Sequence, residues 1–323
     1  MSKKANKMFS KLSFPLFLVF ILLVISIKFC CPNNPNYLIV SSTFKNNQVL
    51  NKVYKPANIV VDKPITVGNY FKFIDSIVQK YDSVTSYRLT EHLLVRANPW
   101  IIDTLKNTDY YTMKNKGRFV YDQKKIVVLH KGDSILLPDS ALAKKILQSF
   151  QNTMIDINIP EFKLRIIEDS NVLYECPIRV GRPEMKFLKM SNRVTDLRTK
   201  TGTGFIVNHV RNPNYYNPVN GHQYFVTKRD DLIVTALPQI PFIETEINGI
   251  RNGQLIHPTT NPVTLGKAYS NGCIGTKEGD AWVIYYYAPI GTKINIRYDL
   301  QVNDSLGQKI TLKDIYNQNT ALN

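Results

Sequence analysis

Short alternating runs of apolar and polar residues dominate the sequence from about Met154 to Asp299. The segments IDINIPEFKLRIIED, NVLYECPIRVG, KTGTGFIVNHVRNP and TKINIRYDL follow the two-residue period of a strand that buries one face. Glycine, proline and other turn residues separate these runs, and one short helix, EGDAWVIYYYA, follows near the end. Many short strands with little helix predict a mainly β sandwich or barrel-like domain over residues 154–300.

The preceding residues, 37–153, mix helical and strand periods. NYFKFIDSIVQKYDSV repeats apolar residues at helical spacing, and RLTEHLLVRANPWIIDTLKN predicts two helices that meet at Asn98–Pro99. KGRFVYDQKKIVVLHKGDSILLPD predicts two strands around a hairpin-type turn at Gly132–Asp133, and DSALAKKILQSFQN predicts a capped helix. We therefore expect an α+β accessory domain before the β-rich domain, and a C-terminal tail over residues 301–323.

The first 36 residues have the pattern of a segment that inserts into a membrane. A basic start, MSKKANKMFSK, precedes the apolar run LSFPLFLVFILLVISI from Leu12 to Ile27. Because no small-residue cleavage site follows, we expect an uncleaved transmembrane signal anchor, with the body of the protein on the exported, periplasmic side and the N-terminus in the cytoplasm. The apolar run is short for a full bilayer span, and a removed signal peptide is the alternative.

The chain is strongly basic, with 41 Lys and Arg residues against 25 Asp and Glu residues and a formal net charge of +16. Such an excess favours a polyanionic partner: nucleic acid, an anionic membrane or a carboxylate-rich wall polymer. No compact nucleic-acid-binding motif is present and the lysines are spread along the chain, so we predict no nucleic-acid partner. No spacing typical of metal ligands occurs, so we predict no metal and no cofactor, and the sequence indicates no particular oligomeric state.

Cys273 lies in a small polar segment, GKAYSNGCIGTKEGD, rather than in an apolar run. Backbone N–H groups are accessible in such a turn, and a thiol can act there as a nucleophile if a base takes its proton. The nearest histidine is His257, at the end of the strand-like run in QLIHPTT. An inert buried thiol and a disulfide to Cys176, the other cysteine beyond the N-terminal segment, are the alternatives.

The order of residues around this pair resembles a known family. IHPTTNPVTLGKAYSNGCIGT contains a histidine, a Leu-Gly step and then Ser-x-Gly-Cys, and is similar to the signature of the L,D-transpeptidase catalytic domain, or YkuD family. ECPIRVGR and TDLRTKTGTGFIVNHVRNP are similar to the family's paired strand and threonine–glycine approach. The resemblance spans about Ile155 to Asp299. It implies a β-rich enzyme that cross-links the stem peptides of peptidoglycan.

The resemblance also implies a role for each residue of the site. Cys273 would form a thioester with a tetrapeptide stem and release its terminal D-alanine, and His257 would act as general base and then as acid. The family orients this histidine through a backbone carbonyl, here that of Pro258. Backbone N–H groups at positions 272 and 273 are candidates for the oxyanion hole. The residues that would shape the turn are Ser270, Asn271 and Gly272.

The sequence departs from the family pattern Ser-His-Gly-Cys-Ile-Arg at two places. Asn271 stands where the pattern has histidine, and Gly275 stands where it has arginine. The missing arginine matters more, because a guanidinium is well suited to fix a loop or a substrate carboxylate. The candidates for a compensating cation that binds substrate are Arg251, Lys267 and Lys277.

Two other residues are weaker candidates for substrate binding. His209 in FIVNHVRNP is expected to be structural or to line the pocket, and Arg229 in TKRDD is expected in a solvated turn where it could position an acidic stem. The aromatic helix is expected to pack Trp282, Ile284 and Tyr285 into the core instead of forming a platform for sugars.

Transpeptidation is the predicted activity, and two alternatives stay open. A hydrolase with the same site, acting as an L,D-carboxypeptidase or endopeptidase, would result if water outcompeted the acceptor amine. A wall-binding scaffold would result if catalysis had been lost together with the arginine.

Overall fold

The structure is a computed structural model that describes residues 57–318. These residues fall within a single unit, Leu38–Asn323. The predicted anchor, residues 1–36, lies outside the described residues. Between residues 57 and 318, no helix combines the length and the apolar character that a bilayer span requires.

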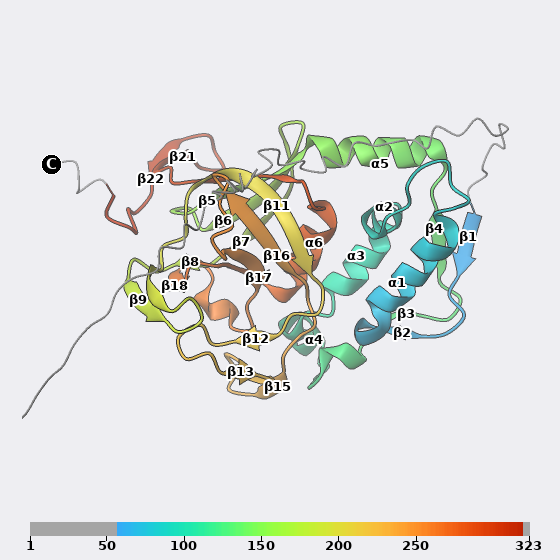
Figure 1. Cartoon of the computed structure of the whole chain (residues 1–323), viewed down its shortest axis with the longest axis horizontal. Coiled ribbons are helices and arrows are strands. Elements are labelled where there is room, and N and C mark those ends of the chain that lie inside the picture. Colours follow the sequence, from blue (N-terminus) through green and yellow to red (C-terminus); the bar gives the residue numbers. More distant parts are fainter. Residues whose placement is uncertain (1–56, 319–323) are drawn as a thin grey trace, which may run out of the picture. The chain divides into compact units, whose positions relative to one another are not determined.

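An eight-stranded sheet forms the centre of the β-rich part (Figure 1). Its strand order is β19-β17-β16-β11-β20-β5-β6-β7. The β20–β5 and β17–β19 pairs are parallel and the other pairs are antiparallel. The bounds of these strands are β5 (Thr153–Asn158), β6 (Lys163–Glu168), β7 (Asn171–Pro177), β11 (Gly202–Val210), β16 (Phe242–Ile247), β17 (Leu255–Pro258), β19 (Ile274–Thr276) and β20 (Lys293–Arg297).

The chain that leaves β7 connects the two edges of this sheet. Shortly after β7 ends, Arg179 forms an antiparallel bridge with Gly275 of β19, the strand at the opposite edge. The Arg179 N–H donates to the Gly275 carbonyl at 2.8 Å, and the Gly275 N–H donates to the Arg179 carbonyl at 3.0 Å. This bridge brings the sheet close to a closed barrel, and the mainly β, barrel-like domain predicted from the sequence is confirmed.

Short two-stranded pairs surround the main sheet. The pair of β8 and β18 is parallel and brings the segment before Cys273 beside the chain that follows Arg179. The bounds of these pairs are β8 (Val180–Gly181) with β18 (Ala268–Ser270), β9 (Met185–Leu188) with β10 (Arg193–Asp196), β12 (Tyr215–Tyr216) with β13 (Gln223–Tyr224), β14 (Val226–Lys228) with β15 (Val234–Ala236), and β21 (Gln301–Asn303) with β22 (Lys309–Thr311).

Helices predominate before β5. Their bounds are α1 (Val67–Tyr81), α2 (Glu91–Arg96), α3 (Pro99–Lys106), α4 (Tyr110–Asn115) and α5 (Ser140–Asn152), with a short 3₁₀ helix at Gln123–Lys125. The predicted break at Asn98–Pro99 is confirmed, because α3 begins at the proline, whose missing N–H is tolerated in the first turn. Asp139 caps α5 by accepting a hydrogen bond from the Leu142 N–H at 2.8 Å.

The predicted hairpin at Gly132–Asp133 is wrong in its pairing. Strands β3 (Val127–Leu129) and β4 (Ser134–Leu137) do flank the turn, but β3 pairs with β2 (Ile65–Thr66) and β4 pairs with β1 (Ala57–Val60). The turn itself bonds to the residue after β1, since the Gly132 N–H donates to the Val61 carbonyl at 2.8 Å. Strands β3 and β4 therefore each pair with an earlier strand of the chain instead of with one another.

Helix α6 (Glu278–Tyr287) connects the helical part to the β-rich part (Figure 1). Trp282, Ile284 and Tyr285 are at most 1% exposed, so the predicted packing of this helix into the core is confirmed. Glu91 of α2 accepts hydrogen bonds from the hydroxyls of Tyr285 and Tyr286, at 3.1 and 2.8 Å. The predicted domain boundary at residue 153 stays a prediction, but residues on both sides of it share one hydrophobic core.

Candidate active site

The candidate nucleophile and base come from two neighbouring strands. The parallel register pairs Ile256 with Ile274 and His257 with Gly275. Both isoleucines are buried in the core, at 1% and 0% exposure. Because side chains alternate along a strand, His257 and position 275 lie on the opposite face of this strand pair, and we expect Cys273, just before β19, to continue the alternation on that face. Cys273 is a free thiol, as is Cys176, so the disulfide alternative is wrong.

The His257 ring is fixed in one orientation. Its Nδ1 lies 2.9 Å from the Pro258 carbonyl oxygen, and a carbonyl can only accept, so Nδ1 carries the proton of the neutral ring and Nε2 is the basic nitrogen. The Phe242 ring packs against the imidazole with 5.0 Å between ring centroids. Desolvation by the surrounding protein, aided by the charge of Arg179, lowers the pKa of His257 to about 4. The imidazole is therefore neutral at pH 7.

The turn before Cys273 is held by its own hydrogen bonds. The Ser270 hydroxyl donates to the Cys273 carbonyl at 2.5 Å and accepts from the Gly272 N–H at 3.2 Å. Gly272 has φ of +110°, a conformation that favours glycine. The Asn271 side-chain oxygen accepts from Arg182 at 2.6 Å. The Gly272 N–H, one of the two candidate oxyanion donors, is thus already engaged within the loop.

Two residues that the sequence did not single out support this turn from behind. The Thr199 hydroxyl donates to the Gly272 carbonyl at 3.0 Å and accepts from the Gly181 N–H at 2.8 Å. The Tyr316 hydroxyl donates to the Gly181 carbonyl at 2.7 Å and accepts from the Thr199 N–H at 3.1 Å. Tyr316 is only 5% exposed, so part of the predicted C-terminal tail packs behind the cysteine loop. No local pattern marks either residue in the sequence.

The thiol of Cys273 is protonated in this environment. Burial raises its pKa, while a backbone hydrogen bond at Leu255 and the charge of Arg179 act in the opposite direction. A neutral thiol needs a base to remove its proton as it attacks, and the neutral imidazole of His257 is the candidate base. The arrangement suits general-base activation of a sulfur nucleophile.

Among the described residues, Arg179 carries a charge that lowers the pKa of both His257 and Cys273. Its side chain is half-buried, and its Nη1 donates to the Thr264 hydroxyl at 3.3 Å. Sequence reasoning missed this residue, although it lies in the quoted segment ECPIRVG. The bridge to Gly275 that brings it to the site depends on closure of the barrel, which local sequence does not reveal.

The three cations proposed from the sequence have exposed side chains. Arg251 is in the turn between β16 and β17, Lys267 precedes β18, and Lys277 precedes α6. Their role in binding substrate stays a prediction.

Arg229 is not in a solvated turn, and that prediction is wrong. Its side chain is 2% exposed and its Nη1 lies 2.6 Å from Glu278 Oε1, in an ion pair buried on both sides. Its other nitrogens donate to the Thr235 hydroxyl at 2.8 Å and to the Gln123 side-chain oxygen at 3.1 Å. Arg229 therefore links the helical part to α6 through its contacts with Gln123 and Glu278. Its buried guanidinium is not accessible to an acidic stem peptide.

His209 packs against other aromatic rings between α2, β11 and α6. Its Nε2 lies 3.0 Å from the Ala288 carbonyl, and its ring stacks on His92 with 5.2 Å between centroids. Burial lowers its pKa to about 4. These contacts are those of a structural histidine.

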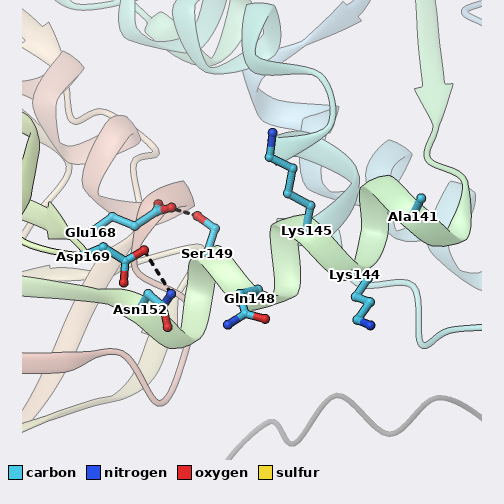
Figure 2. Close-up of a pocket in the computed structure, with 8 residues that line it drawn as sticks. All are labelled: Ala141, Lys144, Lys145, Gln148, Ser149, Asn152, Glu168 and Asp169. Atoms are coloured by element: carbon cyan, nitrogen blue, oxygen red, sulfur yellow. Dashed lines mark hydrogen bonds between the residues drawn. The ribbon is translucent and has the colours of Figure 1, made fainter.

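A shallow cavity of about 370 Å³ lies away from Cys273, where α5 meets the turn between β6 and β7 (Figure 2). In it, Ser149 donates to Glu168 at 2.5 Å and Asn152 donates to Asp169 at 3.1 Å. Its polar groups bond to one another across the surface, and it contains none of the predicted site residues.

Residues 152–296 match the family model of the L,D-transpeptidase catalytic domain, YkuD. The sequence has no match among curated proteins. An L,D-transpeptidase structure from Mycobacterium smegmatis is 16% identical with a TM-score of 0.32, over 45% of this chain and 58% of that chain. One from Mycobacterium tuberculosis is 17% identical with a TM-score of 0.31, over 45% and 57%.

A third solved L,D-transpeptidase, from Xylanimonas cellulosilytica, is 13% identical with a TM-score of 0.33, over 76% of this chain and 100% of that chain. The matched region spans less than two thirds of the length of the two mycobacterial chains.

Proposed function

We propose that this protein cross-links peptidoglycan stem peptides through a thioester on Cys273, because residues 152–296 match the family model of the L,D-transpeptidase catalytic domain, YkuD. The observation that carries the proposal is the parallel register of β17 and β19, which pairs His257 with Gly275, two residues after Cys273. Cys273 is the nucleophile, and His257 is its base.

In the first half of the reaction, Cys273 attacks the carbonyl carbon of the amide that joins the L-centre of the donor stem to its terminal D-alanine. His257 Nε2 takes the thiol proton and passes it to the departing amine, so D-alanine leaves with a neutral amino group and the stem remains as a thioester. The Pro258 carbonyl holds the ring through Nδ1 at 2.9 Å and stabilises the imidazolium between these transfers.

The second half reverses these proton transfers with a different amine. A side-chain amine of a neighbouring stem attacks the thioester, His257 accepts the amine proton, and the thiol leaves and is reprotonated. Because the Gly272 N–H is engaged with Ser270 at 3.2 Å, the N–H of Cys273 is the first donor to the oxyanion in both halves. Net charge and atom count are unchanged over the cycle.

The N-terminal sequence and the overall charge support a location at the exported side of the cytoplasmic membrane. Residues 1–36 anchor the chain in the cytoplasmic membrane, and the catalytic domain acts on the exported, periplasmic side. A net charge of +16 suits a wall polymer rich in carboxylates. Residues 37–153 form an accessory part that supports α6 through Glu91, which accepts from Tyr285, and through Gln123, which donates to Glu278.

Incubation of the purified protein with tetrapeptide-bearing muropeptides, followed by mass spectrometry, tests the proposal. Cross-linked dimers with release of free D-alanine are the expected products. Tripeptides and D-alanine without dimers would instead identify a hydrolase, and binding without any product would identify a scaffold. Either of those results overturns transpeptidation, and a Cys273→Ala variant gives the background for all three.

The rate of thioester formation is expected to stay above half its maximum down to about pH 4. The reason is the pKa of His257, lowered to about 4, because the base fails only when it is protonated. Single-turnover acylation followed by intact-protein mass spectrometry from pH 3.5 to 8 measures the midpoint. NMR titration of the His257 ring, assigned by comparison with His257→Gln, checks it independently. A midpoint near 6.5 would contradict the neutral, desolvated imidazole.

A further inference from the structure

Three residues lie in a row across three strands of the barrel. His257 on β17 pairs with Gly275 on β19, and Gly275 pairs on its other side with Arg179. Residues directly opposite one another on paired strands project from the same face, about 5 Å apart from strand to strand. If the strand alternation continues one residue before β19, Cys273 lies on this face as well, two residues before Gly275. The row therefore has the base His257 at one end and the cation Arg179 at the other. Gly275, which has no side chain, lies between them.

The glycine at the centre of this row makes room for the arginine. A Cβ atom placed on Gly275 would lie 2.5 Å from Arg179 Nε and 2.7 Å from its Cγ, closer than such atoms approach. The Arg179 side chain thus lies directly over the Gly275 backbone. No side chain larger than hydrogen fits at position 275 while Arg179 keeps this place, so the two positions form a complementary pair.

Position 275 is also where the family pattern has the arginine that this chain lacks. On the basis of the proposed function, we infer that Arg179 supplies the missing site cation from the adjacent strand, reaching over Gly275 to stabilise negative charge on the Cys273 sulfur. Among the described residues, its Nε has no hydrogen-bond partner although it is buried. A buried, unused donor of this kind is suited to a charge that forms only during the reaction.

The groups that face Arg179 are consistent with this role. Cys273 and Tyr269 interact electrostatically with Arg179, and the charge of Arg179 lowers the pKa of His257. One guanidinium nitrogen of Arg179 donates a hydrogen bond to the Thr264 hydroxyl. No carboxylate is among these interactions, so Arg179 forms no ion pair within the described part of the chain. Arg179 acts as a positioning residue that sets the electrostatics of the nucleophile and base.

The test is the pH dependence of Cys273 alkylation by iodoacetamide, measured by intact mass on the full chain. Replacing Arg179 with glutamine is expected to move the midpoint upward by about one to two pH units, and to slow alkylation at pH 7 by roughly 10- to 100-fold. Gly275→Ala keeps the arginine but displaces it, and an upward shift of the same sign is expected. Arg193→Gln removes an equal charge from exposed strand β10, and no shift is expected.

The direction of the shift separates this role from a merely structural one. Burial raises the pKa of Cys273, so a variant that only loosened the site would let water in and lower the midpoint. Loss of the Arg179 cation instead raises the pKa of Cys273, and therefore the midpoint of alkylation, further. A downward or absent shift in both Arg179→Gln and Gly275→Ala would overturn the inference, as would an upward shift produced by Lys267→Gln or Lys277→Gln instead.

A double variant, Arg179→Gly with Gly275→Arg, returns the cation to the position of the family pattern. It is expected to bring the midpoint back toward that of the unmodified protein, whereas either single change is not. Alkylation needs no stem peptide, so a chain that forms no cross-links can still display the shift. Failure of the proposed function and failure of this inference are thereby distinguishable.

Discussion

Replacement of Cys273 with serine is expected to reduce cross-link formation by on the order of 10³-fold or more. A hydroxyl at the same place is a far weaker nucleophile than a thiol, and a neutral His257 with a pKa of about 4 is a weak base for it. The rate of D-alanine release from a tetrapeptide stem, followed by mass spectrometry, measures the loss. The serine variant should keep the melting temperature of the unmodified protein to within a few degrees.

The matched control is Cys176→Ala, which removes the other free thiol of the described residues. Cys176 is 3% exposed, and burial raises its pKa well above the ordinary value, so it is unreactive. Its loss should leave cross-linking unchanged. Dimer formation at an undiminished rate by the Cys273→Ser variant would mean that another group is the nucleophile.

Replacement of Arg229 with alanine is expected to lower the free energy of unfolding by about 3 to 5 kcal/mol, because Glu278 is then buried without its cation. Burial already raises the pKa of Glu278, and Arg229 is the main influence that opposes this. Urea unfolding followed by tryptophan fluorescence measures the change, since Trp282 lies in the same core.

An exposed ion pair supplies the comparison for Arg229. Lys163 lies 2.9 Å from Glu175, with about 40% of each side chain accessible to solvent, so Lys163→Ala should cost less than about 1 kcal/mol. Similar losses for the two variants would show that the Arg229–Glu278 pair does not hold the helical part to α6.

Sequence patterns predicted the helices and strands better than the long-range contacts between them. Strand alternation after Met154, the helix start at Pro99 and the burial of Trp282 all follow from local periods that the fold preserves. The motif singled out His257 and Cys273, and the register of β17 and β19 pairs His257 with Gly275, two residues after Cys273.

What sequence reasoning missed depends on partners far along the chain. TKRDD has the composition of a surface turn, and only the position of Glu278 makes Arg229 a core residue. Arg179 becomes part of the site through a bridge between strands at opposite edges of the sheet, and Tyr316 through hydrogen bonds to Gly181 and Thr199. Local composition carries no information about such contacts.

Closure of the barrel has a consequence for the order in which this protein matures. The sheet joins Lys293 to Met154 and Gly275 to Arg179, contacts between residues distant in sequence that form slowly because long loops must close first. The guanidinium of Arg179 therefore reaches the strand that follows Cys273 only when the barrel closes, whereas the pairing of β17 with β19 joins segments less than twenty residues apart. A nascent or partly folded chain would thus carry Cys273 without this neighbouring cation.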